Sequence, residues 1–248
     1  MEQEHQQRYY ELGRTYWWLA GKYRVLQDVL RRAGLPKDGR LRVLDLGCGP
    51  GNLLDVLGEH GDVFGSDYSA DALRFCVGRD YRRLFRADFH HLPVRAASFD
   101  LVTCCDVLEH LSDDRRAMAE LLRILKPGGL LLATVPAFEF LWGDHDTLYG
   151  HQRRYRAPQL RERLRAAGFE LQRVTYFEPA YLVPLWLYRN LKKRLARGDG
   201  LAQRDDFVAF WPPLNALLSR LVAAERFPLR VMDFPFGVTL LALARRPK

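Results

Sequence analysis

The sequence lacks several features that would place the protein in a specialised class. No run approaches the roughly 20 apolar residues that a membrane-spanning helix needs, and residues 1–8 are too polar for a secretory signal. The four cysteines show neither a paired metal-ligand spacing nor a secreted disulfide pattern. They are Cys48, Cys76, Cys104 and Cys105. We therefore expect reduced thiols and a cytoplasmic protein.

Internal repeats and low-complexity linkers are also missing. The 248 residues are 48% hydrophobic and 27% charged, an ordinary globular composition that suits one large α/β domain. The net charge of +8 leaves nucleic acid, an anionic membrane surface or an acidic substrate as partners. Because the arginines are scattered, a solvated basic surface explains the charge equally well.

A glycine-rich turn after a short buried strand is the most informative local feature. The apolar run Leu41–Leu46 predicts the strand, and an apolar-periodic helix begins at Asn52. The three glycines between them are Gly47, Gly49 and Gly51. Such a turn brings the backbone close to a ligand and points a helix N-terminus at an anionic group. The G-x-G-x-G spacing, with Asp45 two residues earlier, differs from the G-x-G-x-x-G of dinucleotide folds.

Strands and helices alternate along the rest of the chain. Further strands are predicted over 62–67, 83–87, 99–105, 130–135, 169–177 and 238–244. Helices are predicted over 69–77, 113–125 with Ser112 as its cap, and 158–167, and residues 136–157 should be a loop. This alternation predicts a parallel sheet with helices on both faces. We expect one domain over 1–248, with an N-terminal helical cap (1–35) and a helical insertion (178–230).

Asp67 ends the second predicted strand, about 20 residues after the first glycine. An acidic side chain at this place can accept two hydrogen bonds from a ribose diol. The alternative is an aspartate that caps the helix after Ser69. The ribose interpretation indicates a nucleoside ligand without saying which one.

Three later motifs extend the pattern of the glycine turn. They are Arg86-Ala87-Asp88-Phe89, Asp100-Leu101-Val102 with Asp106-Val107-Leu108-Glu109-His110-Leu111, and Leu125-Lys126-Pro127-Gly128-Gly129. With the glycine turn and Asp67, they resemble, in order and spacing over about 41–135, class I S-adenosylmethionine-dependent methyltransferases of the ubiquinone/menaquinone-biosynthesis-like group (methyltransferase domain types 11 and 12). The resemblance implies a Rossmann-like, seven-stranded, mostly parallel sheet whose last strand is antiparallel.

The same resemblance implies where S-adenosylmethionine binds. It would lie across the carboxyl ends of the first, second and fourth strands. Asp88 would bond the exocyclic amine of adenine, Phe89 would pack on the ring, and His110 would lie beside the methionine part. The implied contact residues are Asp45, Gly47, Cys48, Gly49, Gly51, Asp67, Tyr68, Asp88, Phe89, Cys105, Asp106 and His110. Residues 16–22 also resemble a family segment, in which an arginine stands at Lys22.

Two features argue against chemistry on nucleic-acid bases. Cys104 and Cys105 lie within a predicted strand and lack the Pro-Cys context of a cysteine nucleophile. The Asn/Asp-Pro-Pro-aromatic signature of enzymes that methylate base amines is absent after that strand. We therefore expect a small-molecule or lipid-like acceptor and no nucleic-acid partner.

Residues 142–155 follow the fifth predicted strand and are rich in groups that could act on an acceptor. His145 or His151 could be a general base, and Arg153 or Arg154 could hold an anionic group. A loop ordered by its own ion pairs is the alternative. No second cluster completes a metal site, so we expect none.

His145 is the preferred base because Asp144 and Asp146 flank it and could orient its ring. His151 stands beside two arginines instead, which suits an acidic substrate.

A basic amphipathic helix is predicted within the insertion, over 185–197. Its apolar side comprises Leu187, Tyr188, Leu191 and Leu195, and its basic side comprises Arg189, Lys193, Arg194 and Arg197. The helix could pack on the sheet with a solvated basic face. Alternatively, it could touch an anionic membrane at the inner face and deliver a lipid-like acceptor.

These observations predict an enzyme that moves a methyl group from S-adenosylmethionine to an oxygen, nitrogen or carbon. A non-catalytic module that binds S-adenosylmethionine is the alternative from another class, and an NAD-dependent oxidoreductase is a second alternative that the glycine spacing disfavours. The acceptor, the methylated atom, the use of a base and the oligomeric state stay open.

Overall fold

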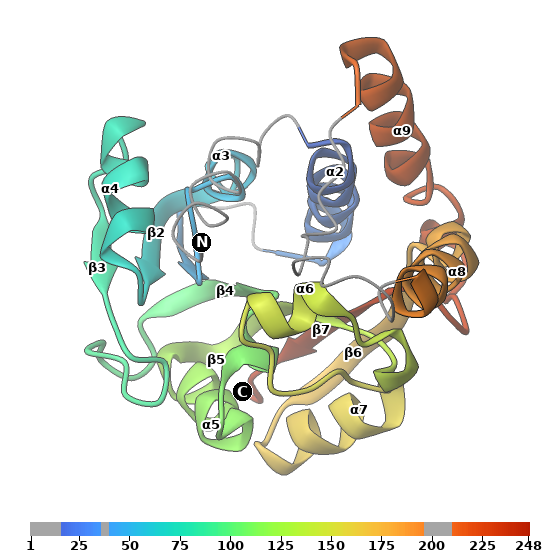
Figure 1. Cartoon of the computed structure of the whole chain (residues 1–248). Coiled ribbons are helices and arrows are strands. Elements are labelled where there is room, and N and C mark those ends of the chain that lie inside the picture. Colours follow the sequence, from blue (N-terminus) through green and yellow to red (C-terminus); the bar gives the residue numbers. More distant parts are fainter. Residues whose placement is uncertain (1–15, 36–39, 196–209) are drawn as a thin grey trace.

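A mixed β-sheet lies at the centre of the protein (Figure 1). The computed structural model describes residues 16–35, 40–195 and 210–248, except for the side chains of 193–195. In these residues the strands form one seven-stranded sheet in the order β3-β2-β1-β4-β5-β7-β6. The strands are β1 Leu41–Leu46, β2 Gly61–Asp67, β3 Leu84–Arg86, β4 Phe99–Cys105, β5 Leu125–Pro136, β6 Glu170–Phe177 and β7 Thr239–Arg245. β7 runs antiparallel to both of its neighbours. The predicted Rossmann-like sheet with an antiparallel last strand is confirmed.

Helices cover both faces of the sheet (Figure 1). The helices are α2 Trp17–Arg32, α3 Leu54–Leu57, α4 Ala70–Gly78, α5 Asp114–Ile124, α6 Asp144–Leu148, α7 Ala157–Ala166, α8 Pro179–Leu195 and α9 Pro212–Ala224. The short 3₁₀ turns are η1 Leu108–His110, η2 Glu139–Leu141 and η3 Pro228–Arg230. α2, α3 and α4 lie on one face, and α5 and α7 lie on the other.

Alternate side chains of the central strands build two separate cores. Leu101 and Leu130 pack with the α2 side chains, whereas Val102 and Leu131 pack with those of α5 and α7. Successive side chains of a strand point to opposite faces. Strands buried on both faces therefore read as continuous apolar runs, and this explains why the sequence located them well.

The helix after β4 differs from the prediction at both ends. Asp113 caps it by accepting a hydrogen bond from the amide of Arg116 at 3.0 Å, so Ser112 was the wrong cap. The helix ends at Ile124 and β5 begins at once, so residues 126–129 lie within the strand. The register of β4 against β5 shifts there, which accommodates the glycine pair.

Two other segments also differ from their predictions. The helix expected from Asn52 is reduced to the four residues of α3. Residues 136–157, expected as a loop, contain η2 and α6.

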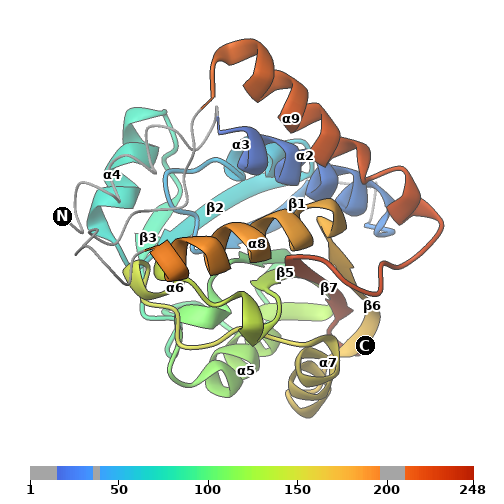
Figure 2. The same cartoon turned by 45° about the vertical axis from the view of Figure 1, so that its right-hand side comes forward.

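The insertion before β7 packs against the N-terminal helix. α9 lies along α2 (Figures 1 and 2), and a Cβ atom on Gly21 would come within 2.4 Å of the Val222 Cβ. The backbone amide of Trp17 also donates to Asn215 Oδ1 at 3.2 Å. The glycine lets the two helices approach closely. Within the described ranges, we find no helix with the length and apolar character to cross a membrane.

α8 is oriented differently from the prediction. Leu187 and Leu191, expected to pack inward in the globular alternative, are 54% and 58% exposed, whereas Arg189 is only 7% exposed. Burial of Arg189 is explained by a buried carboxylate, Asp146, at 3.3 Å. The remaining predicted basic positions, together with Leu195, lie outside the described side chains. They are Lys193, Arg194 and Arg197.

Candidate functional site

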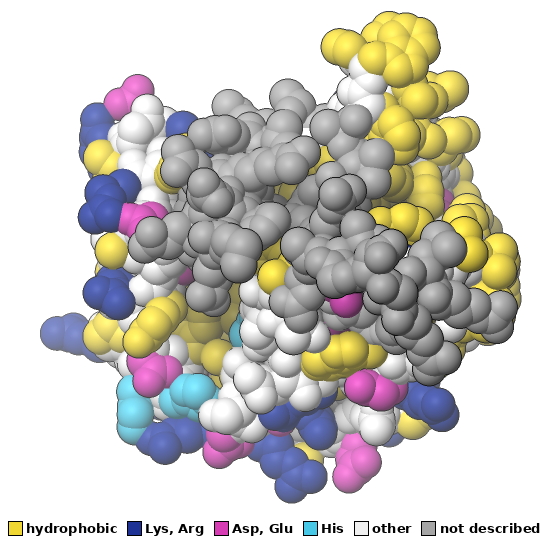
Figure 3. All heavy atoms as spheres, in the orientation of Figure 1, with side chains coloured by type: hydrophobic (Ala, Val, Ile, Leu, Met, Phe, Trp, Pro, Cys, Tyr) yellow, Lys and Arg dark blue, Asp and Glu magenta, His cyan; other side chains and the backbone are white. Residues whose placement is uncertain are grey.

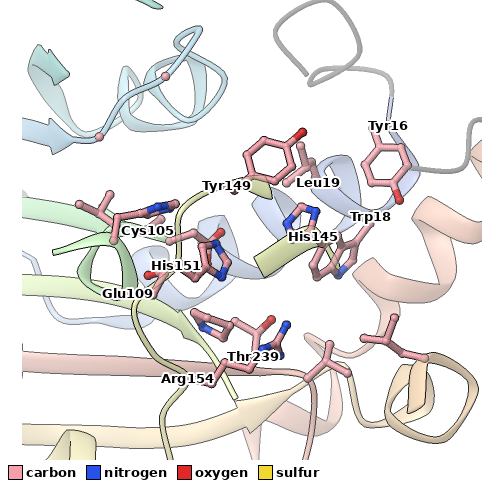
Figure 4. A pocket seen from close by; sticks show the side chains of 18 of the residues that line it. Tyr16, Trp18, Leu19, Cys105, Glu109, His145, Tyr149, His151, Arg154 and Thr239 are labelled. Atoms are coloured by element: carbon pink, nitrogen blue, oxygen red, sulfur yellow. The ribbon is translucent and has the colours of Figure 1, made fainter. Parts of the chain in front are cut away.

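A cavity of about 790 Å³ lies at the carboxyl edge of β1, β2 and β4, with α8 as one wall (Figure 4). The turn after β1 and the residues that follow β2, β3 and β4 form one end. The other end is formed by the start of α2, residues 145–154 and α8. Ligands of open α/β sheets bind where neighbouring strands connect in opposite directions, and β1 and β4 meet in this way.

Most of the site residues predicted from the sequence line this cavity. They are Gly47, Gly49, Asp67, Tyr68, Asp88, Phe89, Cys105, Asp106, His110, His145, His151 and Arg154. Four predicted residues do not line it. They are Asp45, Cys48, Gly51 and Arg153.

The glycine turn leaves an open space above its backbone. Gly47 and Gly49 have φ angles of 74° and 50°, in the left-handed region that favours glycine. A Cβ atom on Gly47 would collide with Val107 at 2.2 Å, but one on Gly49 would meet no atom within 4 Å. Because Gly49 has no side chain, a ligand can lie directly against its backbone.

Asp67 connects this turn to the start of α4. Its Oδ2 accepts from the amide of Gly49 at 2.9 Å and its Oδ1 from the amide of Ser69 at 2.8 Å. Ser69, not Asp67, caps α4, because its hydroxyl accepts from Ala72. Each carboxylate oxygen has a second lone pair, so both can still accept from a ligand diol. Burial raises the pKa of Asp67.

Asp45 and Cys48 support the turn from below. Asp45 is 2% exposed, and its Oδ1 accepts from the Thr103 hydroxyl at 2.6 Å, which links β1 to β4. Burial raises the pKa of Asp45 to about 7. Cys48 packs with Cys76 and Leu54 in a small separate core. Both residues therefore stabilise the turn and do not line the cavity.

Asp106, directly after β4, has an unusual backbone angle and a buried cation as its partner. Its φ is 56°, a strained value for a non-glycine residue. Oδ2 pairs with Lys22 Nζ, and Oδ1 accepts from the Thr134 hydroxyl at 3.0 Å. Burial opposes the charge of Lys22, but Asp106 and Glu178 raise the lysine pKa. Lys22 is thus directed at Asp106.

Asp146 organises the segment between α6 and Tyr155. Its carboxylate accepts from the Gly143 amide (2.8 Å), His151 Nδ1 (2.8 Å), Arg154 Nε and Nη2 (2.8 and 2.9 Å) and Arg189 Nη1 (3.3 Å). Burial alone would raise the pKa of Asp146, but His151 and Arg154 hold it well below its usual range. The segment is therefore ordered by its own ion pairs.

These pairings change the roles expected for the two arginines. Arg154 lines the cavity, but its guanidinium is matched to Asp146 and to the carbonyl of Ala137 at 3.0 Å. Arg153 is drawn away to α5, with Asp114 at 3.1 Å and the Ser112 carbonyl at 2.8 Å. The structure does not bring Arg153 to the cavity, because a buried carboxylate on α5 competes for it.

The carboxylates expected to orient His145 have other partners. Asp144 lies 2.9 Å from Lys192 of α8, and Asp146 binds His151. The centroid of the His145 ring lies 4.4 Å from the centroid of the Tyr149 ring and 5.8 Å from that of the His151 ring (Figure 4). His145 as the base stays a prediction, without the carboxylate orientation proposed from its neighbours.

The structure adds cavity residues that sequence reasoning missed. Glu109 is 1% exposed, and neither carboxylate oxygen has a hydrogen-bond partner in the described residues. Its place between Leu108 and His110, in a motif already identified, was the available signal. The wall from α8 comprises Tyr181, Pro184, Leu185 and Tyr188. Their spacing along one helix face was a second signal.

Comparisons with known proteins agree with this geometry. Residues 18–174 match a family described as methyltransferase domain. A probable S-adenosylmethionine-dependent methyltransferase of Mycolicibacterium smegmatis is 34% identical over 146 residues, which cover 52% of this chain and 52% of that protein. The ubiquinone biosynthesis O-methyltransferase of Aromatoleum aromaticum is 30% identical over 135 residues, covering 50% of this chain and 58% of that protein. The chain thus spans little more than half the length of these relatives.

Solved structures extend the likeness to almost the whole fold. The methyltransferase in complex with the Trm112 activator of Haloferax volcanii has a TM-score of 0.61 at 20% identity, covering 99% of this chain and 95% of that one. The [4+2]-cyclase SpnF has a TM-score of 0.57 at 26% identity, covering 90% and 80%. Because the family match spans β1 to β5 and reaches into β6, the chain belongs to the methyltransferase domain family.

Proposed function

We propose that the protein is an enzyme that transfers the methyl group of S-adenosylmethionine to a small-molecule or lipid-like acceptor. The single observation that carries the proposal is the cavity of about 790 Å³. It has the glycine turn and Asp67 at one end and a wall of aromatic side chains at the other. In this proposal residues 1–248 are one domain, with 1–35 as its cap and 178–230 as its insertion.

The residues at the first end suit the cofactor. The space above Gly49 accepts a group that any side chain there would displace, and Asp67 presents free lone pairs to a ribose diol. Asp88 and Phe89 follow β3 on the same wall, as adenine contacts require. S-adenosylmethionine, when bound, supplies a methyl group made electrophilic by the positive sulfur. Asp106 and His110 would lie beside its methionine part.

The residues at the second end position the acceptor and exclude water. Trp18, Tyr149 and the α8 side chains form a largely aromatic wall (Figure 4). Alignment of two reactants and removal of water account for most of what such an enzyme must supply. His145 faces this end and is the proposed base for an acceptor that must lose a proton.

An apolar outer surface favours a lipid-like acceptor. Exposed hydrophobic side chains gather over α8 and α9 (Figure 3), among them Trp186, Leu187 and Leu191. The inner face of α8 lines the cavity mainly with apolar and aromatic side chains, and Arg189 is its buried charge. Combined with the net charge of +8, this supports peripheral contact with an anionic membrane.

A second candidate is a protein of the same fold without methyl transfer. SpnF is named for a cyclisation, although its fold matches this one. A non-catalytic binding module is the related alternative, and NAD-dependent oxidation is disfavoured by the spacing of the glycine turn. Incubation of the protein with S-adenosylmethionine and a cell extract, followed by mass spectrometry, tests the proposal. Methyl transfer adds one CH₂ unit to an extract compound, whereas cofactor binding with no methylated product would favour the second candidate.

A further inference from the structure

We propose that Glu109, His110 and His151 form a binding site for a divalent metal ion at the acceptor end of the cavity. One ligand atom from each of the three side chains lies within 4.8 Å of the others. Glu109 and His110 come from η1, shortly after β4, and His151 comes from the segment after α6. All three line the cavity, so a bound ion would face the acceptor.

Hydrogen bonds link the two segments that supply these ligands. The amide of Gln152 donates to the Glu109 carbonyl at 2.6 Å. The Tyr155 hydroxyl donates to Asp114 Oδ2 at 2.7 Å, and Arg153 donates to the Ser112 carbonyl at 2.8 Å. The ligand cluster is therefore held by contacts on either side of it, not by a chance approach of two loops.

Glu109 is the strongest single indication of a bound cation. It is buried to 99%, and both carboxylate oxygens lack a hydrogen-bond partner in the described residues. Burying a polar group without a partner is costly, and nearly all buried polar groups in proteins are paired. The cations described nearby are already matched, Lys22 to Asp106 and Arg154 to Asp146. A metal ion would supply the missing partner.

His151 has the support that metal-binding histidines commonly have. Its Nδ1 lies 2.8 Å from Asp146 Oδ1, which fixes the ring and leaves Nε2 to face the cavity as an acceptor. Metal-ligating histidines almost always donate their other ring nitrogen to a carboxylate, a carbonyl or water. Asp146 is itself held by Arg154 and Arg189. Asp146 therefore orients His151, and the two arginines in turn hold Asp146.

One carboxylate and two imidazoles suit Zn²⁺ or Mn²⁺ and leave coordination positions open. An acceptor hydroxyl at an open position would lose its proton more readily, as metal-bound water does. This use of the ion rests on the proposed function, but ion binding itself does not. From the sequence we expected no metal at residues 142–155, because no second cluster completed a site there. In the structure Glu109 and His110, from the motif after β4, lie beside His151.

Titration calorimetry of the metal-free protein, residues 1–248, with ZnCl₂ and MnCl₂, without S-adenosylmethionine, tests the site. We expect one saturable site, weakened at least about tenfold by Glu109→Gln and by His151→Asn. His145→Asn is the matched control, because His145 lines the same cavity outside the cluster, and it should bind the ion like the wild type.

S-adenosylhomocysteine affinity of each variant, measured in parallel, reports whether the fold is intact. Pulsed electron paramagnetic resonance of Mn²⁺ in the wild type gives a second readout, with the nitrogen coupling of two imidazoles expected. Absence of a saturable site, or equal metal affinity in Glu109→Gln and the wild type, would overturn the inference. If S-adenosylhomocysteine binds normally while metal does not, the metal site fails and the proposed function stands.

Discussion

At the scale of single residues, some charged side chains around the cavity are paired with an opposite charge and others are not. Lys22 pairs with Asp106, and Arg154 pairs with Asp146, so these charges are neutralised inside the protein. Asp67 keeps lone pairs available toward the cavity, and Glu109 has no described partner. Asp67 and Glu109, which can still accept hydrogen bonds or bind a cation, are the groups that we assign to the cofactor and to the metal ion.

Asp45 should make stability depend on pH. Burial raises its pKa from 3.8 to about 7, so the folded state favours the protonated form. Its contribution to stability is fully present below about pH 4 and is lost as the pH rises through about 7. Asp45→Asn keeps the acceptor for Thr103 but carries no charge. We expect the melting temperature of the variant, relative to the wild type, to be clearly higher at about pH 8 than at about pH 4. A constant difference across that range would contradict a raised pKa.

His145→Ala should slow the reaction if the acceptor must lose a proton. We expect turnover to fall about 10²–10⁴-fold, the usual contribution of a general base. Affinity for S-adenosylhomocysteine should stay close to that of the wild type, because His145 lies at the acceptor end. Turnover with an identified acceptor and calorimetry together measure the two effects. Unchanged turnover would mean that alignment alone carries the reaction.

At the scale of elements, Asp146 holds the segment that follows β5 against α8. Removing its charge by Asp146→Asn leaves Arg154 and Arg189 buried without a balancing charge. Breaking one partner of a buried ion pair costs about 3–5 kcal/mol of folding free energy. We expect a large drop in the free energy of unfolding measured with urea.

Asp144→Asn is the matched control, because its partner Lys192 and Asp144 itself are partly exposed, at 23% and 36%. An exposed pair contributes about 0–1 kcal/mol. Equal losses in the two variants would show that the carboxylate of Asp146 does not organise the segment.

The sequence predicted the strands well and the contacts between distant elements poorly. Asp67, Asp88 and Asp106 could be placed because they lie at or just after the carboxyl ends of parallel strands, which meet at one edge of the sheet. The inward turn of Arg189 could not be predicted, because its partner Asp146 is 43 residues away and is chosen by tertiary packing. The cap at Asp113 instead of Ser112 is an ordinary boundary error of one residue.

The same limit applies to the candidate site. Local sequence placed Asp144 and Asp146 beside His145, yet the structure pairs them with Lys192 and His151. On a helix, adjacent side chains diverge by about 100°, so neighbours in sequence seldom face each other. Glu109 escaped assignment because the absence of a partner is visible only in three dimensions.

At the scale of the whole molecule, the apolar surface of α8 and α9 should bind membranes. Leu187→Ser with Leu191→Ser should reduce co-sedimentation with vesicles of phosphatidylcholine and phosphatidylserine, because it removes exposed apolar area. Added salt should weaken binding too, given the net charge of +8. Val77→Ser on α4 is the control, as Val77 is 50% exposed away from this surface. Equal binding by the control and the double variant would leave the apolar surface without this role.

Calorimetry with S-adenosylhomocysteine tests the central claim, that the cavity is the cofactor site, most directly. We predict one site in the wild type, no binding of NAD, and affinity at least about tenfold weaker in Asp67→Ala, which loses hydrogen bonds to the ligand. Gly49→Ala should weaken binding similarly, because its Cβ enters the space above the turn. Gly128→Ala is the control, since Gly128 also has a left-handed φ, of 77°, and a Cβ there makes only ordinary contact with the Lys248 side chain, at 3.8 Å, outside the cavity. Equal S-adenosylhomocysteine affinity in the wild type and all three variants, or preferential binding of NAD, would contradict the account.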